Sequence, residues 1–284
     1  MGHLQRLKRV ALEVLPAPWV SSLAARTALL LNEVELHLLQ VLSRREGASV
    51  DVGANLGIYT EILRHCSRQV VAVEPHPAMA QHLRRAFSRG VRVVEAALSD
   101  TPGRGSIRVP VIRGCQVDTR GSLQPVANVE FQTVCLEVEV LTLDSMDLDD
   151  VGFVKIDVEG HELEVVTGGS KLLRASRPRL LVELEERHRS GCVEQMVRKL
   201  EQFGYRGFFV YGHELANVAQ YDPTRHQVLS RAKAVSGVGS RDYVNNFIFL
   251  ADEECGDVLP RIRQCLERLG GWSKLRRALE LSGR

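Results

Sequence analysis

The sequence has no apolar run long enough to cross a membrane without interruption. Its most apolar early stretch, residues 23–42, contains Arg26, Asn32, Glu33 and Glu35, so we expect an amphipathic helix there. Residues 1–15 also lack the apolar core and the small-residue cleavage site of a secretory signal. We therefore expect a cytoplasmic protein without a membrane span.

Closely spaced cysteines are also absent. The six cysteines are scattered and form no CxxC motif, which argues against a zinc knuckle and against a dense disulfide framework. A reducing cytoplasm is the simplest setting for this pattern. A single Cys115–Cys135 bridge across one loop is the alternative.

The chain has no large excess of charge of one sign. Its formal net charge is +2 at pH 7, too small for an extended nucleic-acid-binding surface. Hydrophobic residues make up 44% and charged residues 25%, which are ordinary values for a globular protein. With 284 residues the chain is long enough for one large α/β domain or two small ones.

Apolar stretches of strand length alternate with amphipathic stretches of helix length. We predict strands at 48–53, 69–75, 91–99, 151–160, 178–186, 205–211 and 243–251, and helices at 3–14, 20–43, 58–66, 77–89, 161–174, 192–204 and 258–281. The strands are nearly continuous apolar runs, typical of a parallel sheet covered on both faces. We predict an α/β domain at 47–251, with a helical N-terminal cap at 1–46. A helical tail at 252–284, broken at Gly270 and Gly271, is expected to pack on the same domain.

The alternation stops between residues 101 and 143. Two strands, at 103–112 and 131–143, are expected to form an antiparallel excursion. The residues between them have no clear periodicity, and a long loop inside a compact domain is commonly functional or mobile. We predict that this loop, residues 113–132, is a substrate lid. Its polar side chains, which suit a polyhydroxylated or anionic acceptor, are Arg113, Asp118, Arg120, Ser122 and Gln124.

The stretch SVDVGANLGIYTEI, residues 49–62, places a glycine turn between a strand and a helix. Open parallel sheets bind ligands at this carboxyl edge of their strands. The dinucleotide fingerprint needs glycine where this chain has Asn55 and Ile58, so the pattern disfavours NAD. Gly53 allows a sharp turn and the close approach of a ligand. Asp51 would repel a pyrophosphate and attract a cation.

A carboxylate ends the second predicted strand. Glu74 lies seventeen residues after Gly57, where it can accept hydrogen bonds from both hydroxyls of a ribose. A nucleoside with a positively charged neighbour suits these residues better than a diphosphate does. S-adenosylmethionine has this character, because it combines a ribose, a sulfonium and an amino-acid tail. Ser99 and Asp100 follow the third strand, where an adenine edge can be read.

Charged residues interrupt the strand that contains FVKIDVEG. Lys155 and Asp157 fall on one face by alternation, although a central parallel strand is expected to be apolar. The two could pair with one another, and Asp157 is expected to face the crevice. Glu159, His161 and Glu162 follow at its mouth and in the first helical turn. Because acids in a first turn also stabilise the helix, a structural role is the alternative for Glu159 and Glu162.

The next predicted strand carries Glu183 and Glu185 on one face, and His188 follows in the loop. Carboxylates grouped with imidazoles are suited to removing a proton from a hydroxyl. The same oxygen ligands would suit a divalent cation. The usual Asp-rich spacing is absent, however, and we predict no metal site.

Six of these segments resemble a known family. DVGANLGIYT, VVAVEPHPAM, VRVVEAALSD, LTLDSM, VKIDVEGHELEVVTGG and PRLLVELEERH occur in this order between about residues 49 and 190. They resemble the FkbM family of S-adenosylmethionine-dependent methyltransferases, and a looser resemblance continues to YVNNFIFL near residue 250. The IDVEGHE block is the most specific part, whereas DVGANLG is shared more widely among methyltransferases.

The resemblance implies a Rossmann-like seven-stranded methyltransferase fold and O-methylation, often of a sugar or polyketide-derived hydroxyl. The cofactor residues that it implies at matching positions are Asp51, Gly53, Asn55, Gly57, Glu74 and Ser99. Asp157 and Glu159 would face the reacting centre. The N-terminal helices and residues 251–284 lie outside the resemblance.

A mechanism follows from these expectations. Methyl transfer from a sulfonium to a hydroxyl is a direct displacement, which needs an aligned acceptor and a base for its proton. His161 or Asp157 is the predicted base, and His161 has the more suitable ordinary pKa, about 6.5.

Two other functions stay open. One is a catalytically silent S-adenosylmethionine-binding protein that uses its helical ends as partner surfaces, for example in a homodimer. The other, less favoured, is an NAD-linked oxidoreductase. The carboxylates at Asp157 and Glu159 favour an enzyme, since a nucleoside binder has no need of them.

Overall fold

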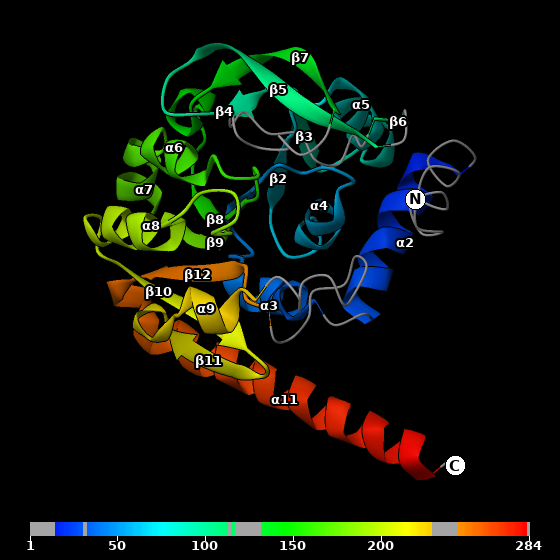
Figure 1. Cartoon of the computed structure of the whole chain (residues 1–284), viewed down its shortest axis with the longest axis vertical. Coiled ribbons are helices and arrows are strands. Elements are labelled where there is room, and N and C mark those ends of the chain that lie inside the picture. The colour runs from blue at the N-terminus through cyan, green and yellow to red at the C-terminus, as the bar shows by residue number, and fades with distance from the viewer. Residues whose placement is uncertain (1–14, 31–32, 113–114, 117–131, 229–242, 283–284) are drawn as a thin grey trace.

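The chain folds around a large mixed sheet (Figure 1). The computed structural model describes residues 15–30, 33–112, 115–116, 132–228 and 243–282. The strands of this sheet are β1 (Ala48–Val52), β2 (Gln69–Val73), β3 (Val91–Val94), β8 (Val151–Ile156), β9 (Arg179–Glu183), β10 (Tyr205–Tyr211), β11 (Glu214–Asn217) and β12 (Asn246–Ala251). Within the described residues their order is β11-β10-β12-β9-β8-β1-β2-β3. The five strands from β9 to β3 are parallel, and β12, β10 and β11 are antiparallel to their neighbours.

Helices cover both faces of the sheet. One face carries α2 (Ala17–Leu30), α3 (Val34–Leu42), α4 (Ile58–Leu63), α5 (Pro77–Ala86) and α11 (Cys255–Ser282). The other face carries α6 (Glu162–Thr167), α7 (Ser170–Ser176) and α8 (Cys192–Glu201). The short helix α9 (Pro223–His226) follows β11. This layered arrangement confirms the predicted Rossmann-like α/β class.

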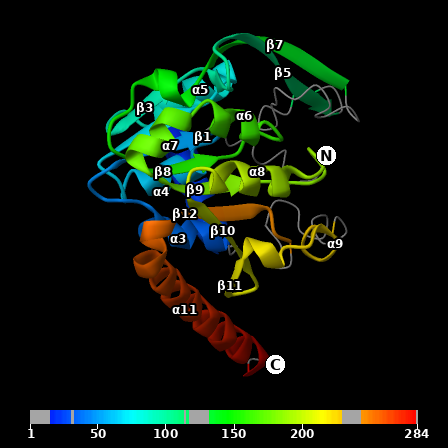
Figure 2. The same cartoon turned by 90° about the vertical axis from the view of Figure 1, so that its left-hand side faces the viewer.

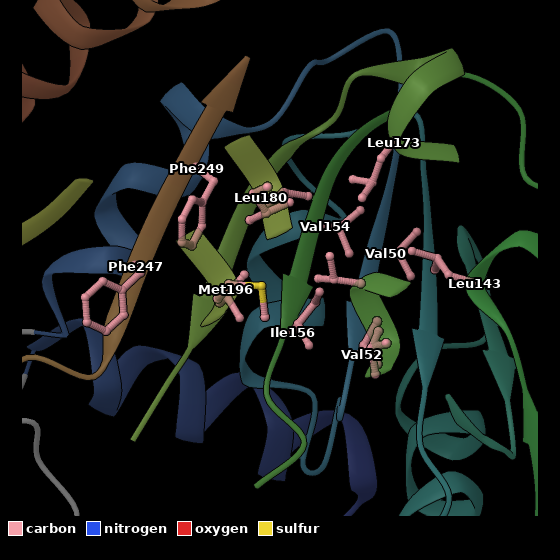
Figure 3. Close-up of a cluster of buried hydrophobic side chains, with 14 of the residues drawn as sticks. Val50, Val52, Leu143, Val154, Ile156, Leu173, Leu180, Met196, Phe247 and Phe249 are labelled. Carbon is pink, nitrogen blue, oxygen red and sulfur yellow. The ribbon is translucent and has the colours of Figure 1, made fainter. Parts of the chain in front are cut away.

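The core is divided by the sheet into two apolar layers. Figure 3 shows the layer beneath α6, α7 and α8, where Val154 and Ile156 of β8 pack near Val50 and Val52 of β1. Alternate residues of the same strands, such as Phe153, lie on the opposite face with α3 and α11. Both faces of the central strands are therefore buried, which explains their nearly continuous apolar sequences.

A second sheet leaves the main one after β3. It consists of β4 (Ala97–Leu98), β5 (Gly103–Ile112), β6 (Cys115–Gln116) and β7 (Gln132–Leu141), in the order β4-β7-β5-β6. Strands β5 and β7 form a long antiparallel ladder at the end of the molecule opposite to α11 (Figures 1 and 2). The predicted antiparallel excursion is confirmed, but the strand predicted at 91–99 is divided between the two sheets.

Several predicted boundaries were wrong. The stretch 20–43 forms α2 and α3 instead of one helix, and β11 adds an eighth strand to the predicted seven. The helix predicted at 161–174 is divided into α6 and α7 at Gly168 and Gly169. A Cβ at Gly168 would lie 2.1 Å from the carbonyl oxygen of Ser99, so the chain approaches too closely there for another residue. Conversely, α11 continues through Gly270 and Gly271, because a glycine costs a helix only about 1 kcal/mol.

Some predictions fall on parts of the chain that are not described. The side chains of the predicted lid and the helix predicted at 3–14 lie outside the described residues. Cys135, exposed on β7, is a free thiol, so the alternative Cys115–Cys135 bridge is not formed. None of the helices within the described ranges is long and apolar enough to cross a membrane.

Candidate functional site

The candidate site lies at the carboxyl edge of the parallel strands. Ile156 of β8 is in register with the neighbouring residues of β1 and β9, so the residues that follow, Gly53, Asp157 and Glu183, form one row across three strands. The chain proceeds from β1 toward β2 in one direction and from β8 toward β9 in the other. The row therefore crosses the topological switch point, where open α/β sheets bind ligands.

The glycine turn passes directly over the end of β8. Gly53 has a φ of 81°, and a Cβ at this position would lie 1.8 Å from the carbonyl oxygen of Asp157. Asn55 and Gly57 also have left-handed φ values, 52° and 79°. A Cβ at Gly57 would lie 2.6 Å from the Phe87 ring, so this glycine allows packing against α5. The two glycines thus let the turn approach the end of β8 and helix α5 closely.

Glu74 is buried beneath this turn and holds it in place. One carboxylate oxygen accepts the Asn55 N–H at 2.8 Å, and the other accepts the His76 N–H at 2.8 Å. Burial raises the pKa of Glu74 to about 7, although the two hydrogen bonds oppose the shift. Each oxygen of an ionised carboxylate has a second acceptor position. Glu74 can therefore receive ribose hydroxyls while it holds the turn, and this donor and acceptor arrangement fits a nucleoside.

Asp51 lies on β1, two residues before Gly53, and is buried. Its carboxylate is 2% exposed and accepts a hydrogen bond from the Thr60 hydroxyl at 2.5 Å. Burial raises its pKa to about 6, while Thr60 and the charge of Lys155 lower it. Asp51 therefore fixes the start of α4 and adds negative potential under the turn.

Ser99, Asp100 and His161 come together although 62 residues separate the first from the last. His161 Nε2 lies 2.9 Å from Ser99 Oγ, and His161 Nδ1 lies 3.7 Å from the nearest oxygen of Glu164. The Ser99 hydroxyl donates to Asp100 at 3.2 Å. Burial lowers the pKa of His161, against the charges of Glu164 and Asp100. These contacts tie His161 to the segment that follows β4.

The loop after β8 is held in place by the carboxylate of Glu162. Glu159 and Gly160 adopt left-handed φ values of 55° and 100°. The Glu162 carboxylate accepts the Gly160 N–H at 2.8 Å and the Val158 N–H at 3.4 Å. Burial raises the pKa of Glu162 to about 7, against the hydrogen bond from Gly160. The contacts of Glu162 are therefore those of a residue with a structural role, which was the alternative for it. Glu159 differs, because its Oε2 lies 3.1 Å from His188 Nε2.

Charged side chains also lie together at the ends of β8 and β9, where Lys155 approaches Glu183. Lys155 is 1% exposed, and its Nζ donates to the Ile156 carbonyl at 3.3 Å and lies 3.9 Å from Glu183 Oε2. The same ammonium lies 5.1 Å from the centre of the Tyr59 ring. Lys155 thus forms an ion pair with Glu183. From the sequence, a pair with Asp157 was considered instead.

Helices α3 and α4 add Glu35 and Tyr59 to this group. We call it the Lys155 cluster and define it as Glu35, Tyr59, Lys155, Asp157 and Glu183. Burial raises the pKa of Tyr59 well above its ordinary value, and the carboxylates of Glu33, Glu35, Glu183 and Asp157 add to the shift. Burial also raises the pKa of Glu35, while Lys155 lowers it. Sequence reasoning missed Glu35 and Tyr59. The available signal was their position, an acid inside an apolar helix and a tyrosine directly after the glycine turn.

Glu185, beyond β9, has hydrogen-bond partners of its own. Its carboxylate accepts hydrogen bonds from Arg187 and, at 2.6 Å, from the Tyr243 hydroxyl. Burial raises its pKa, but these hydrogen bonds outweigh burial and leave the pKa below its ordinary value. In the described part of the chain, no group of three or more His, Cys, Asp or Glu side chains is arranged to hold a metal ion.

Comparisons with known proteins agree with this architecture. The strand order and the helices on both faces of the sheet define a Rossmann-like domain of the methyltransferase class. The family model of the methyltransferase FkbM domain matches residues 51–206, more than half of the chain. The chain therefore belongs to the FkbM methyltransferase family, which confirms the predicted family and S-adenosylmethionine as the cofactor. A search of curated proteins finds no significant match.

Solved structures with a similar arrangement are distant in sequence. A methyltransferase FkbM from Methylobacillus flagellatus KT is 17% identical with a TM-score of 0.45, and the match covers 72% of this chain. This chain spans only 43% of the length of that protein. A putative methyltransferase from Streptococcus mutans in complex with SAH is 10% identical, with a TM-score of 0.42, 77% of this chain covered and 96% of that chain covered.

Proposed function

We propose that this chain transfers a methyl group from S-adenosylmethionine to a hydroxyl of a sugar, glycolipid or polyketide-type acceptor. The observation that carries the proposal is the row formed by Gly53, Asp157 and Glu183. It sets proton-accepting carboxylates beside the main-chain turn that suits a nucleoside. A methyl transfer to a hydroxyl requires this neighbourhood, because the acceptor must lose a proton as it is methylated.

The residues of the glycine turn are suited to hold the cofactor. In this proposal the Glu74 carboxylate accepts the ribose hydroxyls, and Ser99 with Asp100 lies at the adenine end. Asp51, Asn55 and Gly57 shape the turn, as their contacts and φ values support. When bound, S-adenosylmethionine supplies an electrophilic methyl group on a positively charged sulfur.

The rest of the rate enhancement concerns the acceptor hydroxyl. Holding the hydroxyl in line with the methyl group can contribute roughly 7–11 kcal/mol at best through proximity. A base contributes about 10²–10⁴-fold more. Asp157, Glu159 and His161 stay the catalytic residues predicted from the sequence, with Asp157 closest to the glycine turn. The cytoplasmic setting, a homodimer and the division at residues 47 and 251 stay predictions as well.

The experiment has two stages. Calorimetry with S-adenosylmethionine and, separately, with NAD tests the cofactor, and we expect binding of the first only. A screen with labelled methyl groups then compares sugars, glycolipids and polyketide alcohols with matched amines. Label on hydroxyl compounds supports the proposal, and label on amines alone contradicts it. Cofactor binding without transfer to any class would favour the silent binding protein.

A further inference from the structure

We infer that Glu183 is the catalytic base that takes the proton from the acceptor hydroxyl, and that Lys155 is its positioning residue. The inference rests on the proposed function, and it adds a residue outside the catalytic set predicted from the sequence. It depends on the direction in which the site extends across the sheet and on the partners of each candidate base.

The site extends from the donor side toward β9. Glu74 marks the ribose end at β2, Gly53 lies at β1, and the backbone of Asp157 lies directly under Gly53. Glu183 is one strand further from Glu74, at the end of β9. Neighbouring strands are about 4.8 Å apart. In the proposed function Glu74 binds the ribose, so Glu183 lies at the end of the row farthest from the ribose, and we assign this end to the acceptor.

Two of the other candidate bases, His161 and Glu159, have partners away from the end of β9. His161 contacts Ser99 after β4, and Glu159 faces His188 at the mouth. Glu183 is held at one oxygen by the Asn245 side-chain amide at 2.8 Å, and its other oxygen lies 3.9 Å from Lys155 Nζ. Its side chain remains 25% exposed, against 1% for Lys155. The Glu183 carboxylate is thus held by Asn245 and Lys155, while part of its side chain stays exposed.

The surroundings of Glu183 also adjust its proton affinity. The ionisable groups that face it are Lys155 and Asp157 from β8, Glu159 from the following loop, Glu185 beyond β9, Tyr59 from α4 and Tyr243 before β12. Burial, followed by the negative charge of Asp157, raises the pKa of Glu183 well above its ordinary value, while Lys155 lowers it. A base with a pKa nearer to the working pH is the more effective one.

In the proposed step the methyl group moves from sulfur to oxygen and the hydroxyl proton moves to Glu183. The acceptor oxygen forms a bond to the methyl carbon, the carbon–sulfur bond breaks, and its electron pair stays on sulfur. The hydroxyl proton moves to Glu183, which becomes a neutral acid, and solvent removes that proton after the product leaves. Lys155 limits how far the acidic surroundings raise the proton affinity of Glu183.

The test compares E183Q, E183D and K155M with E201Q, a control on the exposed end of α8. Turnover is measured with the panel of sugars, glycolipids and polyketide alcohols, and S-adenosylmethionine affinity by calorimetry. We expect E183Q to lose about 10²–10⁴-fold in kcat while its cofactor affinity stays within about threefold. E183D should recover part of the loss, and E201Q should match the unchanged protein. Unchanged kcat in E183Q would overturn the inference.

A second readout needs no acceptor. In protein labelled with ¹³C at glutamate side-chain carboxyls and saturated with S-adenosylhomocysteine, the signal missing from E183Q identifies Glu183. Its titration midpoint should lie above that of an ordinary glutamate, and K155M should move it further up. An ordinary midpoint that K155M leaves unmoved would contradict the inference. Absence of cofactor binding, or methylation of amines only, would instead refute the proposed function.

Discussion

The two sides of the carboxyl edge use the same kind of side chain in different ways. On the donor side, formed by the glycine turn and the ends of β1 and β2, Glu74 accepts two main-chain N–H groups. On the acceptor side, at the ends of β8 and β9, Glu183 is held by the side chain of Asn245 and lies beside Lys155. Burial raises the pKa of both glutamates.

This difference shows how one residue type is given two tasks. A carboxylate bound to the main chain maintains the shape of a loop, so its loss disturbs the fold and cofactor binding together. A carboxylate bound to side chains can gain or lose a proton while the main chain stays in place. The donor side is therefore expected to respond mainly in stability and affinity, and the acceptor side mainly in turnover.

The largest effect is expected for Gly53→Ala on the donor side. The new Cβ would meet the Asp157 carbonyl oxygen at 1.8 Å, and φ is 81°. Overpacking costs roughly 1–3 kcal/mol and a left-handed non-glycine residue about 1–2 kcal/mol more. We expect a lower melting temperature, and weaker S-adenosylmethionine binding because the turn must shift to relieve the collision. Thermal unfolding and calorimetry measure the two effects.

Gly90→Ala is the matched control, because its φ is 75° and no atom lies within 4 Å of the new Cβ. It shares the backbone strain without the collision. If both variants lose cofactor affinity equally, the close approach at Gly53 is not what shapes the donor side.

The next effect concerns Glu74→Gln. A glutamine keeps one acceptor oxygen but turns an amide N–H₂ toward a main-chain N–H, which costs about 1–3 kcal/mol. In the unchanged protein the pKa of Glu74 is about 7, so S-adenosylmethionine affinity should increase as the pH rises from 6 to 8 and the carboxylate becomes ionised. The increase is at most about tenfold per pH unit. Calorimetry at several pH values should show a weaker and flatter dependence for E74Q; an unchanged slope would assign it to another group.

The loop after β8 should make stability depend on pH in a defined direction. Burial raises the pKa of Glu162 to about 7 from an ordinary value of 4.5. Between these values the folded chain keeps a proton that the unfolded chain has released, so the free energy of unfolding falls as the pH rises. The contribution of one such group is on the order of 3 kcal/mol. Denaturant titrations at pH 4.5 and 7 should show the fall, and Glu162→Gln should reduce it; a rise would contradict the assignment.

The smallest effect on turnover is expected for His161→Asn. Its contact with Ser99 predicts a loss of about 1 kcal/mol in stability and less than about tenfold in kcat, if Glu183 is the base. Thermal unfolding and the labelled-methyl assay check both numbers. A loss of more than about a hundredfold in kcat with intact cofactor binding would return the base to His161.

Much of the fold follows from local pattern. The apolar strands around Val50 and Val154 and the glycine turn at Gly53 are recognisable because burial on both faces demands continuous apolar residues and a tight turn demands glycine. Helix ends were predicted less well. Gly168 and Gly270 look alike in the sequence, but only Gly168 faces a neighbouring carbonyl that excludes a Cβ.

The candidate site divides in the same way. The sequence alone determined the family, the cofactor and the position of the acids at strand ends, because strand alternation and the order of motifs are local properties of the chain. Only the tertiary structure decided which partner each acid has. Glu74 binds main chain, Glu183 lies beside Lys155, and His161 contacts Ser99. These pairings join residues far apart in sequence, and burial at their meeting points sets both the geometry and the proton affinity of each group.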